Sequence, residues 1–291
     1  MPVVRLSCNR LALPYRKLLS LLVRLTLPLL LAEPVVAMHL GRLSASAETA
    51  ASDGVGRLTC RAGDGRASVE EATGWIVGSA DTVMTAAHLF YSRDNAIDPR
   101  GCVFRLYKAD GTVRQAARIR YARSPWQQER YRNDSAHDFA VLKLDRAMAV
   151  GLVPAIAAGG RGTPTAVLLL SFPIGAADRL ARRSAGEARP FPFGMARYGP
   201  NGIRISDPSR LFASSVDSDS GSSGAPYYSA RGGSPIGLHL GYACAGAEGC
   251  INFGLKLDAD MLAVIAAVSA DRADDRALQL AEAGTTGPLR Y

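Results

Sequence analysis

Residues 74–88 read Gly-Trp-Ile-Val-Gly-Ser-Ala-Asp-Thr-Val-Met-Thr-Ala-Ala-His, which is two short apolar runs separated by a turn. The runs have the length of β-strands, and the segment from Gly78 to Asp81 has the small and polar residues of a hairpin turn. The second run reaches His88 through two alanines, whose small side chains leave room for an imidazole at a crowded junction. The stretch therefore predicts a β-hairpin that ends in a functional histidine; a solvent-facing histidine at a strand end is the alternative.

Similar strand-length runs recur along the chain, with Gly, Asp, Asn and Pro between them. No helix-length amphipathic pattern separates them, which is typical of sandwiches and barrels and argues against an alternating α/β sheet. The exception is residues 258–270, where an aspartate precedes an apolar stripe. There we expect a C-terminal helix, continuing in broken form to about Ala283. The strand-length runs cover residues 74–77, 82–85, 104–107, 139–144, 166–170 and 236–240.

The composition is that of an ordinary globular protein, with 48% hydrophobic residues in a chain of 291. The formal net charge is +8, but the first 24 residues carry five basic residues and no acidic one, so about +3 remains for the rest. The remaining basic residues are scattered, and no nucleic-acid-binding motif is present. We therefore expect no nucleic-acid partner.

The first 47 residues have the features of an export leader. A basic start precedes an apolar stretch from Leu18 to Ala32, interrupted by Arg24, and small residues follow. Cleavage after Ala37 or after Ala47 fits the small-x-small rule. An uncleaved membrane anchor is the alternative, but the apolar run falls well short of the roughly 20 residues that a spanning helix needs. We expect a periplasmic or secreted protein with no membrane contact beyond the leader.

Outside the leader the chain has four cysteines, Cys60, Cys102, Cys244 and Cys250. An even number in an exported chain suggests two disulfides. Cys244 and Cys250 close a short loop, which favours that pair, and Cys60 with Cys102 follows by elimination. A zinc site is the competing interpretation, but no C-x-x-C pattern or nearby histidine supports it, so we expect no metal.

Asp138 stands directly before the apolar run of residues 139–144. A carboxylate at the mouth of such a strand is half desolvated, so it is costly unless it accepts a hydrogen bond. The N–H group of a histidine that serves as a base would satisfy it. An exposed loop aspartate is the alternative, because Asp134 and His137 are close by; we interpret His137 as an exposed neighbour.

Ser223 lies in Gly-Ser-Ser-Gly-Ala-Pro, residues 221–226. A serine nucleophile needs a base beside it, and glycines permit a tight backbone that exposes the hydroxyl. The amides of Gly221 and Ser223 would then point at one place and form an oxyanion hole. A stretch this rich in Gly and Ser is usually a flexible loop, and Ser220 and Ser222 are rival nucleophiles, but the flanking glycines favour Ser223.

The three motifs, T-A-A-H after G-W-I-V-G, D-F-A-V-L-K-L and G-S-S-G-A-P, resemble those of the chymotrypsin-like (trypsin/V8-like, PA clan) bacterial serine proteases in the order His88, Asp138, Ser223. The resemblance covers about residues 55–270. It implies an all-β fold of two six-stranded antiparallel β-barrels, at 55–157 and 158–270, with a C-terminal α-helix before a tail at 271–291. It also implies a serine endopeptidase that acts on protein or peptide substrates without a cofactor.

The resemblance leaves the P1 preference open. Asp217, six residues before Ser223, resembles the pocket-floor carboxylate of trypsins and implies a basic P1 residue. His239 resembles the pocket histidine of glutamyl endopeptidases and implies an acidic one, with Gly241 as a third substrate-binding position. The two charges could instead neutralise each other, or both residues could be merely structural. Ser222 stands where many animal members carry aspartate, so the chain should not use their zymogen switch.

Two other classes remain to be compared. A protease-fold binding protein without activity usually has a substituted triad, whereas all three motifs are intact here. An esterase of the α/β-hydrolase type requires a G-x-S-x-G elbow and the order serine, acid, histidine. The order here is histidine, aspartate, serine, which excludes the esterase.

Overall fold

The computed structural model describes residues 44–45, 53–61, 69–91, 97–150, 166–174, 180–192, 203–230, 234–244 and 249–271. The expected export leader, apart from residues 44–45, lies outside the described residues. So do the glycine-rich junction near 158–164 and the tail after residue 271. In the part of the chain that is described, no helix is both long and apolar enough to cross a membrane.

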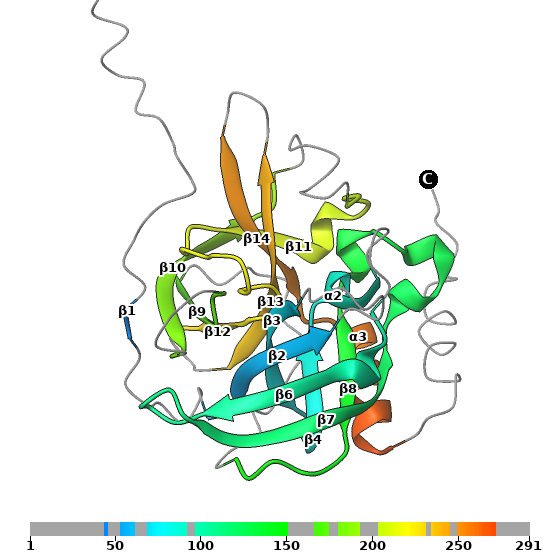
Figure 1. The fold of residues 1–291 in the computed structure, drawn as a ribbon. Coiled ribbons are helices and arrows are strands. Elements are labelled where there is room, and N and C mark those ends of the chain that lie inside the picture. Colours follow the sequence, from blue (N-terminus) through cyan, green and yellow to red (C-terminus); the bar gives the residue numbers. More distant parts are fainter. Residues whose placement is uncertain are drawn as a thin grey trace, which may run out of the picture. The chain divides into compact units, whose positions relative to one another are not determined.

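Six antiparallel strands close into a first barrel in the order β2–β3–β4–β8–β7–β6 (Figure 1). The hairpin predicted at residues 74–85 is present, and it turns at Gly78, whose φ of 70° suits a glycine. Apolar side chains that include Ile76, Phe104 and Leu142 fill the interior. The strands are β2 (Val55–Arg61), β3 (Val69–Val77), β4 (Ser79–Thr85), β6 (Cys102–Tyr107), β7 (Val113–Arg123) and β8 (Ala140–Leu144).

A second ring of six antiparallel strands follows in the order β9–β10–β11–β14–β13–β12, closed by the pairing of β9 with β10. The two-residue strand β1 (Ser44–Ala45) adds to the start of β10. The predicted pair of six-stranded barrels is thus confirmed. The strands are β9 (Ala166–Ser171), β10 (Arg182–Pro190), β11 (Leu211–Ser214), β12 (Pro226–Ser229), β13 (Pro235–Cys244) and β14 (Cys250–Lys256).

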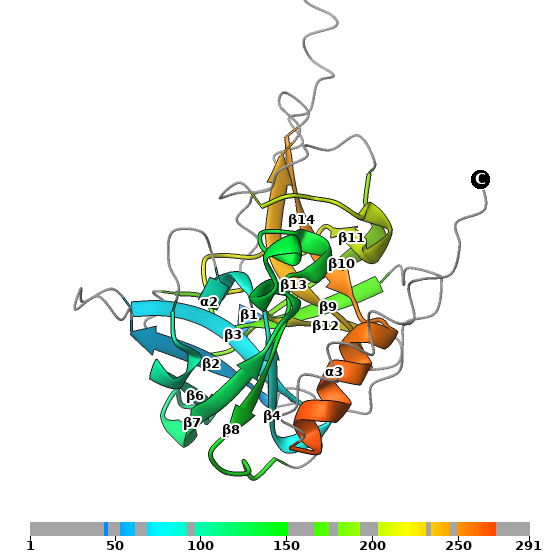
Figure 2. The same cartoon turned by 90° about the vertical axis from the view of Figure 1, so that its right-hand side faces the viewer.

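The predicted C-terminal helix is α3 (Ala259–Ser269). It begins after Asp258, whose side chain accepts a hydrogen bond from the backbone N–H of Met261 at 3.0 Å, as expected for an N-cap. Although α3 follows the second barrel in sequence, it packs against β4 and β8 of the first (Figure 2). The expected broken continuation to Ala283 lies outside the described residues.

Two disulfides are present, Cys60–Cys102 and Cys244–Cys250. The first pair lies opposite one another on β2 and β6, and the second joins the ends of β13 and β14. Both predicted pairings are confirmed, and the zinc interpretation of these cysteines is wrong. Two structural disulfides indicate an extracytoplasmic protein.

Candidate active site

His88 and Asp138 meet at one end of the first barrel. His88 begins the short helix α2 (His88–Tyr91) just after β4, and Asp138 just precedes β8. Because β4 pairs with β8, with Thr85 opposite Ala140, both residues lie at the same strand ends. The imidazole Nδ1 is 2.8 Å from Oδ2 of Asp138, and the backbone N–H of His88 donates to Oδ1 at 2.9 Å. The carboxylate, only 1% exposed, therefore has the imidazole partner that the sequence required.

The pKa of His88 is raised above its ordinary value of 6.5 by this pair. Burial by itself lowers the pKa, but the charge of Asp138 and its hydrogen bond outweigh burial. The aspartate thus favours the imidazolium form. This is the electrostatic property that a base needs when it accepts a proton during a reaction.

The loop that carries Ser223 connects β11 to β12, and both barrels hold it in place. From β3 of the first barrel, the N–H of Thr73 donates to the carbonyl oxygen of Ser223 at 3.0 Å. The Thr73 hydroxyl donates to the carbonyl oxygen of Gly221 at 2.8 Å. From β13 of the second barrel, the carbonyl oxygen of His239 accepts the N–H of Gly224 at 2.8 Å. The loop is fixed at its backbone on both sides of the half-buried serine.

The glycines of this loop allow it to lie against the strand that leads to His88. Gly224 has a φ of 81°, and a Cβ atom there would lie 2.8 Å from the backbone nitrogen of Ala86, with Thr85 and Thr73 closer still. Gly221 also has a positive φ, of 91°. Ala86 lies two residues before His88, so the structure brings the serine loop alongside the strand end that bears the histidine. Within the described residues, the Ser223 hydroxyl itself makes no hydrogen bond, to His88 or to another group.

The structure separates Ser223 from its two rivals. Ser222 is fully buried, donates from Oγ to Ser171 Oγ at 3.2 Å and accepts the N–H of Asp219 at 3.2 Å. Ser220 is exposed, in the turn that the N–H of Ser222 closes onto the carbonyl oxygen of Asp219. The hydroxyl of Ser222 therefore faces the interior, where it acts as a structural group.

The backbone N–H groups around Ser223 differ in whether they have a hydrogen-bond acceptor. The N–H groups of Ser222 and Gly224 have carbonyl acceptors, on Asp219 and His239. Those of Gly221 and Ser223 have no acceptor among the residues that the structure describes. Two amides of one tight loop are thus left unpaired within that part of the chain, at the positions expected for an oxyanion hole.

His239 lies at the inner end of a hydrogen-bonded chain. Its Nδ1 is 2.9 Å from the hydroxyl of Tyr227, which is 3.0 Å from Oγ of Ser214. Burial, together with the charge of His88, lowers the pKa of His239 to about 3, so the ring is neutral at physiological pH. Burial raises the pKa of Tyr227, so its hydroxyl keeps its proton.

Asp217 and Gly241 lie apart from that chain. Asp217 is half-buried, and its backbone N–H donates to Ser184 Oγ at 2.7 Å. No hydrogen bond or ion pair joins Asp217 to His239 within the described residues. Gly241 follows a register shift in β13 and has a φ of 140°. The proposed mutual neutralisation of Asp217 and His239 finds no contact to support it.

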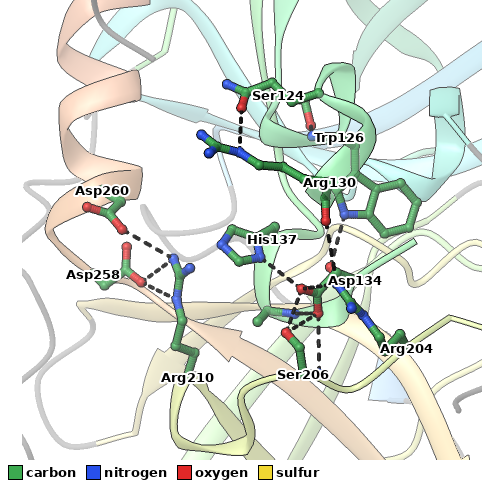
Figure 3. Close-up of polar contacts among 12 residues, drawn as sticks. Ser124, Trp126, Arg130, Asp134, His137, Arg204, Ser206, Arg210, Asp258 and Asp260 are labelled. Atoms are coloured by element: carbon green, nitrogen blue, oxygen red, sulfur yellow. Dashed lines mark hydrogen bonds and ion pairs between the residues drawn. The ribbon is translucent and has the colours of Figure 1, made fainter. Parts of the chain in front are cut away.

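Sequence reasoning missed the roles of two residues that support the site, Thr73 and Asp134. Thr73, in the middle of β3, gave no signal because its hydroxyl acts on a loop about 150 residues away. Asp134 entered the sequence analysis only as a neighbour of Asp138. In the structure its buried carboxylate gathers donors from its own turn and from one distant segment, which holds Arg204 and Ser206 (Figure 3). The view of His137 as an exposed neighbour was wrong, since its ring is 21% exposed, stacks on Tyr131 and hydrogen-bonds to Asp134.

No cluster of three or more His, Cys, Asp or Glu side chains that could hold a metal occurs among the described residues. The double barrel and the placement of its loops define a chymotrypsin-like fold. The chain belongs to the trypsin-like peptidase family, because the profile described as a trypsin-like peptidase domain matches residues 72–238. A search of curated proteins finds no match.

Solved structures with the same fold include several proteases. One is a Glu endopeptidase in complex with MPD, with a TM-score of 0.59 and 19% identity over 81% of this chain and 100% of that one. A thermostable serine protease, AL20, from an extremophilic microorganism has a TM-score of 0.55 and 18% identity over 76% and 99%. The protease Anisep from Arthrobacter nicotinovorans has a TM-score of 0.54 and 15% identity over 75% and 96%. At these identities the likeness is one of fold.

Proposed function

We propose that the protein is a serine endopeptidase in which Ser223 is the nucleophile, His88 the general base and Asp138 the carboxylate that orients His88. One observation carries the proposal. The hydrogen-bonded pair of His88 and Asp138 stands at the end of β4, at the place where the glycine loop of Ser223 packs against the same strand end. This arrangement supports a site in which a base, its orienting carboxylate and a nucleophile come from three distant parts of the chain.

In this mechanism Nε2 of His88 removes the proton of the Ser223 hydroxyl as the oxygen attacks the peptide carbonyl. The N–H groups of Gly221 and Ser223 stabilise the resulting oxyanion. The imidazolium, favoured by Asp138, then gives its proton to the leaving amine as the peptide bond breaks. Water, activated by His88 in the same way, hydrolyses the acyl-enzyme and restores the serine. No cofactor takes part.

The P1 preference is part of the proposal, and Asp217 favours a basic side chain. Its carboxylate is half-buried and has no hydrogen-bond or ion-pair partner among the described residues. It therefore remains available to a lysine or arginine. The matched test is a peptide-library cleavage profile of Asp217→Asn beside Asp219→Asn, an exposed aspartate two residues away. Loss of basic preference in the first variant alone supports the assignment.

An acidic P1 residue is the second candidate, and the chain from Ser214 through Tyr227 to His239 favours it. If Tyr227 donates to Nδ1 of His239, the ring proton is on Nε2, where it can donate to a carboxylate. Strict cleavage after glutamate that is weakened by Tyr227→Phe would support a P1 pocket for acidic side chains at His239. It would contradict the assignment of Asp217 to a basic P1 side chain.

The disulfides and the expected leader both support an extracytoplasmic compartment. Because two disulfides persist only under oxidising conditions, we place the protein in the periplasm or outside the cell. Protein or peptide substrates in that compartment are the partners proposed.

Labelling by a fluorophosphonate tests the proposed function. The wild type should be labelled and should hydrolyse peptides, and Ser223→Ala should lose both while it unfolds at the same denaturant concentration. Ser222→Ala is the matched control, because the buried hydroxyl of Ser222 is not part of the proposed chemistry. Labelling that persists in Ser223→Ala places the nucleophile elsewhere. A folded wild type that neither labels nor cleaves indicates a protease-fold binding protein.

A further inference from the structure

Asp134 lies at the start of the turn that ends at Asp138. The turn is the 3-10 helix η5 (Ser135–His137), with Asp134 as its N-cap and Asp138 as its C-cap. The Asp134 side chain accepts the N–H of Ala136 at 3.2 Å, and its carbonyl oxygen accepts the N–H of His137 at 2.9 Å. Three residues in a fixed turn therefore separate the two aspartates, so a movement of Asp134 moves Asp138.

The Asp134 carboxylate is 2% exposed and collects donors from a second segment, residues 203–206, which precedes β11 (Figure 3). Ser206 Oγ donates to Oδ1 at 2.6 Å and also contacts Oδ2. Arg204 Nη2 lies 3.3 Å from Oδ2, and His137 Nδ1 lies 3.1 Å from the same oxygen. A buried carboxylate with this many donors has one strongly preferred position.

The backbones of the two segments are joined as well. Asp134 and Arg204 form a parallel β-bridge. In it the N–H of Arg204 donates to the carbonyl oxygen of Asn133 at 2.7 Å, and the N–H of Ser135 donates to that of Arg204 at 2.8 Å. The indole N–H of Trp126, in the turn after β7, donates to the carbonyl oxygen of Asp134 at 3.0 Å. The turn is thus tied on one side to its own barrel and on the other to the segment that enters β11.

The geometry points to Asp134 as a positioning residue for the peptidase site: with Ser206 and Arg204 it fixes the turn that aims the Asp138 carboxylate at His88. Asp134 itself touches neither His88 nor Ser223, so it acts through Asp138. The expected effect on turnover rests on the proposed function. The expected effect on the hydrogen bond between Asp138 and His88 does not, because it can be measured without turnover.

Hydrogen bonds to the carboxylate explain why Asp134 stays ionised in the interior. Burial raises the pKa of Asp134, but the hydrogen bonds from His137 and Ser206 outweigh burial and lower it. The side chains that face this carboxylate and can carry a positive charge are the imidazole of His137 from the same turn and the guanidinium of Arg204 from the opposite segment. An amide in its place would present N–H groups to Arg204, a donor itself, so Asp134→Asn should loosen the turn while keeping its shape.

The experiment measures the pKa of the His88 ring by NMR titration, with the resonance assigned through a His88→Gln variant, in the wild type and two Asp→Asn variants. Asp258 is the matched control, because it also caps a helix and pairs with an arginine, Arg210, but makes no hydrogen bond or ion pair with the turn of Asp134 among the described residues. Asp134→Asn should lower the His88 pKa and, in the active enzyme, lower kcat by up to about 10²-fold with little change in KM. Asp258→Asn should leave both unchanged.

A second variant, Ser206→Ala, removes a donor to Asp134 without changing charge and should lower the His88 pKa and kcat in the same direction, by less. Ser206→Thr should restore both, because it keeps the hydroxyl. If Asp134→Asn does not fold, this pair decides the question. A His88 pKa that stays at the wild-type value in these variants overturns the inference. Because the titration needs no turnover, an inert wild type would refute the proposed peptidase without deciding the role of Asp134.

Discussion

The hydroxyl of Thr73 in the first barrel donates a hydrogen bond at 2.8 Å to the carbonyl oxygen of Gly221 in the loop of the second. The same oxygen atom of Thr73 accepts the N–H of Phe172 at 2.9 Å. One fully buried side chain thus fixes two segments of the second barrel, the end of β9 and the loop of Ser223.

Replacing this threonine by valine, Thr73→Val, should lower both stability and reactivity. The carbonyl of Gly221 and the N–H of Phe172 would be left buried without a partner, which should lower the free energy of unfolding by about 1–3 kcal/mol. The fluorophosphonate labelling rate should fall because the loop of Ser223 loses its tie to β3. Urea unfolding and labelling kinetics measure the two effects. Thr82→Val, an equally buried threonine whose hydroxyl contacts Ser79, should cost stability without slowing labelling; equal labelling rates in the two variants would contradict the role of Thr73.

The pH dependence of kcat/KM should report the pair of His88 and Asp138. The base must be neutral, so kcat/KM should rise with pH, with a midpoint above the ordinary histidine value of 6.5. Burial opposes this shift, but the charge and hydrogen bond of Asp138 outweigh it. Asp138→Asn should therefore move the midpoint to lower pH and reduce kcat about 10⁴-fold.

The pair of His88 and Asp138 should also make the free energy of unfolding depend on pH. Folding raises the pKa of His88. The His88 ring therefore contributes fully to the free energy of unfolding below pH 6.5, and this contribution is lost as the pH rises through the pKa of the folded state. Asp138→Asn should abolish that loss. A midpoint of the kcat/KM profile at or below pH 6.5 in the wild type would show that Asp138 does not dominate the environment of His88.

His239 should make the fold sensitive to acid. Its pKa of about 3 in the folded state lies below the ordinary value of 6.5. Between these two pH values the histidine is therefore protonated in the unfolded chain but not in the folded one. Stability should fall as the pH drops below 6.5 towards 3. Comparing urea unfolding at pH 7 and pH 4.5 in the wild type and in His239→Gln isolates this effect, because the variant has no such group to titrate. An equal loss in both proteins would assign the acid sensitivity to other residues.

The two disulfides should differ in their contribution to stability. Cys60 and Cys102 are 42 residues apart, and Cys244 and Cys250 only six. By loop-closure entropy the first should contribute about 4 kcal/mol and the second about 2 kcal/mol. Urea unfolding of the two double Cys→Ala variants checks the order, and a larger loss for the shorter loop would contradict the entropic account.

The fold could be predicted from the sequence because its signals are local. Runs such as residues 82–85 and 166–170 show strand length and turn punctuation, and every run used became a strand. The start of α3 was readable from Asp258, an N-cap before an apolar stripe. The meeting of His88 and Asp138 came from motif order and the family resemblance, since no local pattern reveals that β4 and β8 are neighbours.

The residues that support the site could not be predicted in this way. Thr73 looks like any other residue of a strand, and its partners are set by how the two barrels pack. Asp134 and Ser206 are about 70 residues apart, and neither has a motif around it. The inward direction of the Ser222 hydroxyl follows from the loop conformation. These roles depend on long-range contacts, which residue type and spacing do not encode.

The position of α3 has a consequence for the order in which the chain can fold. The strands of the first barrel are complete once Leu144 has been made, but Ile265 of α3 packs in one apolar cluster with Met84 and Val141 of that barrel. Lys143, which is buried, also donates to the carbonyl oxygen of Ser269 at the end of the helix. The first barrel thus keeps an uncovered apolar flank until more than a hundred further residues have emerged, and a nascent chain halted before α3 should aggregate or bind chaperones.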